Sequence, residues 1–169
     1  NAVTFSGVIL RRLAIHQLAA DRAEQSHHPE LLDAILKSLY KSVQPGLDAD
    51  RLTAVVQKII SVADREYAEH TTTHNKTQLY RNYVQAGMVF TATGNTPRAQ
   101  AMYARAIALQ PDAPDATLAM ANLLQQQGRL AEAFNVLAAA STLDDSEAWP
   151  HIERGKLYLN QMYEASQTD

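Results

Sequence analysis

The sequence predicts an all-α fold of stacked helix pairs, and three observations support this prediction. The first is an internal repeat, in which Gly94, Ala99 and Ala106 recur 34 residues later as Gly128, Ala133 and Ala140. The second is a composition with common alanine, 7% aromatic residues and six glycines, which suits helices that approach closely through small side chains. The third is that β-branched residues occur singly rather than in alternating runs, which disfavours strands. A fixed period near this length is typical of a helical array that presents a binding surface.

The bulk composition excludes several classes of protein. Hydrophobic residues make up 46% and charged residues 20% of the 169 residues, which indicates an ordered, soluble fold. A net charge of -3 and a pI near 6.1 give no basic footprint for nucleic acid. No apolar stretch approaches the roughly 20 residues of a membrane span. The absence of cysteine excludes disulfides, a cysteine-ligated zinc and a thiol nucleophile.

The first two expected helices lie before residue 44. Thr4 or Ser6 can cap a helix that continues to about Glu24. Pro29 suits the start of the second helix, with Glu30 in the first turn, where a negative charge favours the helix dipole. One apolar stripe is expected on this helix, formed by Leu32, Ile35, Leu36, Leu39 and Val43.

A third helix follows the break at Gln44-Pro45-Gly46 and opens at Asp48 or Asp50. Its apolar face consists of Leu52, Val55, Val56, Ile59, Ala63 and Tyr67. The polar stretch 70–76 is expected to be a loop or a frayed helix end.

From residue 78 onward the pattern is regular. It predicts helices near 78–93, 96–109, 113–127, 130–142 and 147–163. Gly94 and Gly128 are expected at the tight turns, where a positive φ suits glycine. Pro111 ends one helix, Pro114 suits the start of the next, and Asp144-Asp145-Ser146 is expected to cap the last.

Residues 80–111 hold aromatic and small residues at a fixed spacing, with a final proline: Tyr83, Ala86-Gly87, Phe90, Gly94, Ala99, Tyr103, Ala106 and Pro111. This pattern resembles that of a tetratricopeptide repeat (TPR). The resemblance implies that the small residues let two antiparallel helices approach and that the three aromatic side chains fill the space between pairs. It also implies an all-α, right-handed α-α superhelix, that is, a TPR-like solenoid.

A second, weaker copy covers residues 114–145. Thr117, Ala121, Leu124 and Leu137 stand at its aromatic and glycine positions, and a final half-copy keeps Gly155 and Tyr158, as a terminal capping helix would. Residues 77–169 are therefore interpreted as TPR-like repeats with a cap. Residues 1–76 are an irregular helical section in the same continuous array, either degenerate repeats, which we favour, or a specialised cap.

The whole layout consists of three irregular helices, a linking helix and then the repeat segment 98–144. This layout also resembles the soluble C-terminal TPR domain of bacterial O-antigen ligase/polymerase-type membrane proteins. This resemblance implies a fragment of a larger glycan ligase or polymerase, with the repeats facing the periplasm. The missing initiator methionine and the lack of a convincing signal peptide agree with a fragment. For a parent protein of another kind, a cytoplasmic location stays open.

The predicted function is non-catalytic scaffolding, in which a concave groove binds a protein partner as a peptide or helix. The TPR resemblance implies that the first helix of each pair lines the concave face. The residues then expected to line the groove are Arg81, Val84, Met88, Thr91, Asp115, Leu118, Asn122, Gln125, Trp149, Ile152 and Lys156. Trp149 is either a binding anchor or, as we favour, a packing residue of the last helix. The alternative to a binding groove is that flanking helices fill the concave face. The lysine- and arginine-based carboxylate clamp of some TPR proteins is disfavoured. Its places hold Val84, Met88, Ala119 and Glu153 rather than cations, and Asn122 alone fits.

Catalysis, metal binding and cofactor binding by this chain are not expected. The acidic residues cluster at helix starts, where capping explains them, and no phosphate-binding or dinucleotide fingerprint occurs. His70 and His74 have the spacing of two zinc ligands on one helix face. The threonines at 71–73 make a firm helix doubtful there, and the sequence identifies no third ligand.

Overall fold

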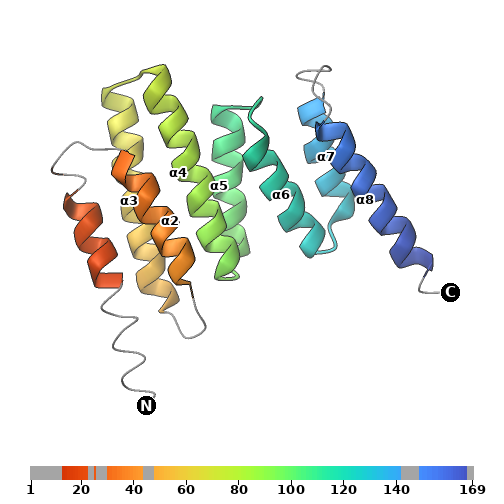
Figure 1. The fold of residues 1–169 in the computed structure, drawn as a ribbon, viewed down its shortest axis with the longest axis horizontal. Helices are drawn as coiled ribbons and strands as arrows, with labels where there is room; N and C mark the ends of the chain where they lie inside the picture. Colours follow the sequence, from red (N-terminus) through yellow and green to blue (C-terminus); the bar gives the residue numbers. More distant parts are fainter. Residues whose placement is uncertain (1–12, 23–24, 26–29, 44–47, 142–148, 167–169) are drawn as a thin grey trace, which may run out of the picture. The chain divides into compact units, whose positions relative to one another are not determined.

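The computed structural model describes residues 13–22, 25, 30–43, 48–141 and 149–166, and within these ranges it contains helices and no strand (Figure 1). The predicted all-α fold class is confirmed. The expected cap at Thr4 or Ser6, the break at Gln44-Pro45-Gly46 and the cap at 144–146 lie outside the described ranges. The chain divides into two compact units, residues 1–106 and 107–169.

The first unit begins with helical residues 13–22, followed by α2 (Glu30–Ser42) and α3 (Ala49–Glu69). Asp48 caps α3, because its side chain accepts a hydrogen bond from the Arg51 backbone N–H at 3.0 Å. The predicted apolar stripes point inward on both helices, with Val43 and Tyr67 half-buried at their ends. Side chains that are almost fully buried include Leu32, Leu36, Leu39, Leu52, Val56 and Ile59.

Helix α4 (Thr73–Ala92) starts earlier than the sequence suggested. The Thr72 hydroxyl accepts from the Asn75 backbone N–H at 3.1 Å and so caps the helix. The expected loop at 70–76 is therefore wrong for 73–76, and the connection to α3 is short. The run of threonines contributes a helix cap, a role that helix propensity alone does not predict. Helices α2 and α3 both pack against α4 (Figure 1).

Helix α5 (Thr96–Leu109) packs on α4 through Gly87 and Tyr103. Tyr103 is 2% exposed, and its ring occupies the space where a side chain at Gly87 would lie. A Cβ atom at Gly87 would be 2.7 Å from Tyr103 Cδ1, which is closer than nonbonded carbon atoms approach. Ala99 and Ala106 are also fully buried on α5. The small residues thus permit the close helix contact that the repeat pattern implied.

The glycine turns of the two repeats have the same geometry. Gly94 and Gly128 both have φ +72°, as predicted. After α4, the Asn95 N–H donates to the Phe90 carbonyl at 2.8 Å, and the Gly94 N–H donates to the carbonyl three residues before it. The same pair of bonds follows the next glycine, 34 residues later. This is the Schellman arrangement, which satisfies the last carbonyls of a helix and favours glycine.

The second unit contains α6 (Pro114–Gln126), α7 (Leu130–Ser141) and α8 (Trp149–Ser166). Pro114 occupies the first turn of α6, as predicted. Helix α7 packs against both α6 and α8, with Leu137 only 1% exposed. Between α7 and α8 the rings of Phe134 and Tyr158 meet edge to face, with their centroids 4.5 Å apart.

Candidate functional site

Four predicted groove residues lie on α4 in the first unit, and their exposure differs. Arg81 is exposed, Met88 and Thr91 are half-buried, and Val84 is buried with 7% exposure. The Thr91 hydroxyl donates to the Gly87 carbonyl at 2.9 Å and lies 3.1 Å from the Tyr103 hydroxyl. Arg81 and Met88 are therefore the members of this group with side-chain surface to offer.

Four other predicted residues, Leu118, Asn122, Gln125 and Lys156, line one cavity of about 170 Å³ in the second unit. The cavity lies between α6 and α8, and the other lining residues are Ala121, Leu137, Glu153 and Leu157. Half of the residues around this cavity thus belong to the predicted groove set, whose role in binding stays a prediction. Leu137 belongs to α7, outside the set of helices expected to face the groove, and was not predicted.

The lining of this α6–α8 cavity combines an apolar floor with a polar rim. Leu118, Leu137 and Leu157 supply apolar surface, and Lys156 pairs with Glu153 at 2.6 Å, so the rim carries no net charge. The side-chain amides of Asn122 and Gln125 make no hydrogen bond within the described residues. Each amide can donate and accept, which is the chemistry that a peptide backbone requires.

The remaining predicted groove residues do not line this cavity. Asp115 and Ile152 are exposed on α6 and α8, and Ile152 has 55% of its surface exposed. Trp149 begins α8, but its side chain lies outside the described part of the structure. Its role as an anchor or a packing residue therefore stays a prediction.

A larger pocket of about 310 Å³ lies in the first unit and was not predicted from the sequence. It is lined from three helices, by Gln57, Ile60, Ser61 and Asp64 of α3, Phe90 of α4, and Arg98, Ala101, Met102 and Arg105 of α5. These residues are far apart in the sequence and form no motif. The packing of α3, α4 and α5 brings these residues together, and we call the site the α3–α5 pocket.

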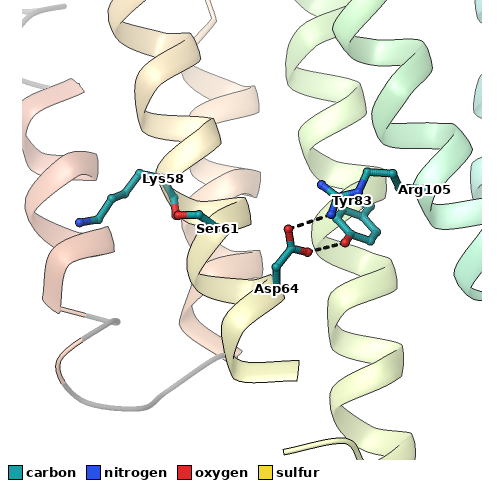
Figure 2. Close-up of polar contacts among 5 residues, drawn as sticks. All are labelled: Lys58, Ser61, Asp64, Tyr83 and Arg105. Carbon is teal, nitrogen blue, oxygen red and sulfur yellow. Dashed lines mark hydrogen bonds and ion pairs between the residues drawn. The ribbon is translucent and has the colours of Figure 1, made fainter. Parts of the chain in front are cut away.

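Asp64 lines this pocket and bonds two neighbouring side chains, those of Tyr83 and Arg105 (Figure 2). One carboxylate oxygen accepts a short hydrogen bond from the Tyr83 hydroxyl, and the other accepts from Arg105 Nη2 at 2.8 Å. The Arg105 guanidinium also lies over the Tyr83 ring, 4.4 Å from its centroid. In Figure 2, Lys58 extends away from Asp64, and its ammonium pairs with Asp21 at 3.3 Å. Both oxygens of Asp64 are thus occupied by partners within the first unit.

Comparison with known proteins identifies the repeat. Residues 90–150 match a family model described as a tetratricopeptide repeat. This segment is similar to TPR proteins. The match includes α5, α6 and α7 and both Schellman turns, so the TPR resemblance inferred from the sequence is supported. No curated protein matches the chain.

The TPR match supports the coarse functional prediction and not the finer one. TPR segments are typical of protein–protein interaction scaffolds, and this is the class that the chain resembles. The comparisons give no support to a ligase- or polymerase-type parent, which stays a prediction. Among the helices that the structure describes, none combines the length and apolarity needed to cross a bilayer.

The two histidines of the suggested metal pair lie on different helices. His70 is the C-terminal cap of α3, whereas His74 lies in the first turn of α4. The spacing of two ligands on one helix face is therefore not realised. Within the described ranges, no group of three or more histidine and acidic residues gathers at a possible metal position.

Tyr83 gives this first unit a pH dependence that can be measured. Burial raises the pKa of the Tyr83 hydroxyl well above its usual value near 10, and the bond to Asp64 adds to the shift. Because the folded-state pKa is raised, the stabilisation is complete below the unfolded pKa and is lost as the pH rises towards the folded value. Urea unfolding should therefore show a free energy of unfolding that falls above about pH 10. The free energy of unfolding of Tyr83→Phe should fall less steeply with pH. An unchanged slope in this variant would contradict the assignment of the pH dependence to Tyr83.

Proposed function

We propose that this chain is a non-catalytic protein-interaction module that binds a partner segment, as a peptide or helix, at the α6–α8 cavity. The observation that carries the proposal is the clustering of Leu118, Asn122, Gln125 and Lys156 around one cavity. These residues were expected to face a partner because the TPR resemblance implies that the first helix of each pair lines a concave face. The similarity of residues 90–150 to tetratricopeptide repeats supports the same class of function.

The size and chemistry of the cavity favour one apolar side chain of a partner rather than a free small molecule. Its volume of about 170 Å³ lies below the roughly 300–1,000 Å³ of typical small-molecule sites. An apolar side chain would pack against Leu118, above the almost fully buried Leu137, while the Asn122 and Gln125 amides bond the peptide backbone beside it. Because Lys156 and Glu153 neutralise each other, we expect the anchor residue to be uncharged.

Residues on α4 are candidates for separate contacts with the partner. Arg81 and Met88 have exposed or half-exposed side chains, whereas Val84 is buried and Thr91 is bonded within the first unit. We therefore assign any partner contact from α4 to Arg81 and Met88.

Photo-cross-linking tests the proposal directly. A photoreactive amino acid at Asn122 should cross-link a protein partner in cells that produce the chain, and the partner can then be identified by mass spectrometry. The same probe at Asn135, an exposed position on α7 that does not line the cavity, is the matched control.

Leu118→Glu in the chain that carries the Asn122 probe should reduce the cross-link at least tenfold. A charge at this position would have to be desolvated against the apolar floor. Leu118 is half-buried, so circular dichroism should show a helical content close to that of the parent chain. Equal cross-linking with and without Leu118→Glu, or equal yields from positions 122 and 135, would contradict the proposal.

A further inference from the structure

The α3–α5 pocket shares no residue with the set proposed above, and its lining has a distinct charge. It contains two guanidinium groups, those of Arg98 and Arg105, and the single carboxylate of Asp64. This excess of positive charge is local, because the whole chain has a net charge of -3.

The two arginines of the pocket differ in their interaction partners. Arg105 is held by Asp64 at 2.8 Å and lies over the Tyr83 ring. Arg98 is exposed, and its side chain has no ion-pair or hydrogen-bond partner within the described residues. The Asp64 carboxylate bonds Tyr83 and Arg105 and makes no ion pair with Arg98 among the described residues. A cation at the edge of a pocket and without a counter-charge attracts an acidic ligand.

Apart from Gln57 and Ser61, the rest of the lining is apolar, and the pocket is larger than one small side chain needs. Ile60 and Phe90, which are 6% and 2% exposed, form part of the wall with Met102. Methionine is unbranched and polarisable, and it adapts to apolar groups of different shape. A volume of about 310 Å³ accommodates a leucine or phenylalanine side chain together with part of its peptide backbone.

We infer that the α3–α5 pocket is a second interaction site, which binds an acidic segment of a partner protein. An apolar side chain of that segment packs against Ala101 and Met102, above the almost fully buried Ile60 and Phe90, and a neighbouring carboxylate bonds the Arg98 guanidinium. The charge complementarity between Arg98 and the ligand identifies the occupant as an acidic peptide. The apolar wall requires a hydrophobic residue beside the acidic one.

Blocked peptides provide the probe. Acetyl-Glu-Leu-Phe-Glu-amide should bind to the full chain and shift the NMR signals of the amides near Arg98 and Ala101. Its neutral glutamine counterpart should bind about two- to fivefold more weakly, which is the size expected for an exposed ion pair. The lysine counterpart should bind more weakly still, and added salt should reduce the difference between the acidic and neutral peptides.

Three variants with exposed parent residues test the location and the charge preference of the binding. Ala101 lies on the pocket wall and is exposed, so Ala101→Trp should fill the pocket without disturbing the core and should abolish binding of the acidic peptide. Ala104 is exposed on the same helix and does not line the pocket, so Ala104→Trp should leave the affinity unchanged. Arg98→Gln should remove the preference for the acidic peptide over the neutral one.

Several outcomes would overturn the inference. These are no detectable binding of the acidic peptide, equal or tighter binding of the lysine peptide, and unchanged binding to Ala101→Trp. Saturable binding of decanoate in the absence of peptide binding would assign the pocket to a small amphiphilic carboxylate instead. Because Leu118 of the α6–α8 cavity is not involved, Leu118→Glu should leave the acidic peptide's affinity unchanged, which separates this test from that of the proposed function.

Discussion

Tyr103→Ala is expected to lower the free energy of unfolding by about 3–5 kcal/mol, the usual cost of truncating a large buried aromatic residue. The ring is 2% exposed and fills the space over Gly87, between α4 and α5. Its removal leaves a cavity lined by two helix backbones that cannot fully close it. Urea unfolding followed by circular dichroism measures the loss. Tyr103→Phe should lose much less, since it retains the ring and removes only the hydroxyl contact with Thr91.

Gly87→Ala tests the same contact from the other helix. The added methyl would meet the buried Tyr103 ring, so we expect a loss of about 1–3 kcal/mol despite the better helix propensity of alanine. In the Tyr103→Ala background the same substitution should be close to neutral or stabilising, because the ring is gone. The coupling energy of this double-mutant cycle measures the contact itself.

Gly155→Ala is the matched control for this cycle. Gly155 stands two repeat steps after Gly87, but a Cβ there meets nothing within 4 Å. Replacement of a helical glycine by alanine should then raise the free energy of unfolding by up to about 1 kcal/mol. A loss at Gly155 equal to that at Gly87 would show that the tyrosine contact does not explain the requirement for glycine.

The repeat pattern predicted several local features of the fold and missed the start of one helix. The 34-residue period predicted the helices after residue 78, the buried Ala99 and Ala106, and the positive φ of the turn glycines, because each depends on residues close in sequence. The start of α4 was missed, because Thr72 acts as a cap, and capping depends on a single hydrogen bond that propensity does not record.

The two candidate sites differ in the same way, because one follows from local helical spacing and the other depends on helix packing. Leu118, Asn122 and Gln125 share one face of α6 by helical spacing, and the TPR resemblance implied that this face lines a groove. Leu137 enters the same cavity from α7, and its place there depends on how the helices pack. The α3–α5 pocket is the extreme case, since Asp64 and Arg105 are paired across 41 positions of sequence. No local pattern marks such a pair, because tertiary packing alone brings the two charges together.

Leu137→Ala should lower the free energy of unfolding by about 2–5 kcal/mol, the typical cost of truncating a fully buried leucine. Leu137 is 1% exposed on α7, between α6 and α8, and also lines the α6–α8 cavity. The substitution should therefore accelerate amide hydrogen exchange in these three helices. Asn135→Ala, at an exposed position on the same helix, should change the free energy of unfolding by less than about 0.5 kcal/mol.

The two roles of Leu137 can be separated by a second substitution. Leu137→Met conserves the volume and should cost less than about 1.5 kcal/mol, while it alters the shape of the cavity floor. If the floor selects the anchor of a partner segment, Leu137→Met should weaken the cross-link from position 122 in a chain that remains folded. Loss of the cross-link in Leu137→Ala alone, with the full yield kept in Leu137→Met, would show that Leu137 supports the cavity only through the stability of the helices around it.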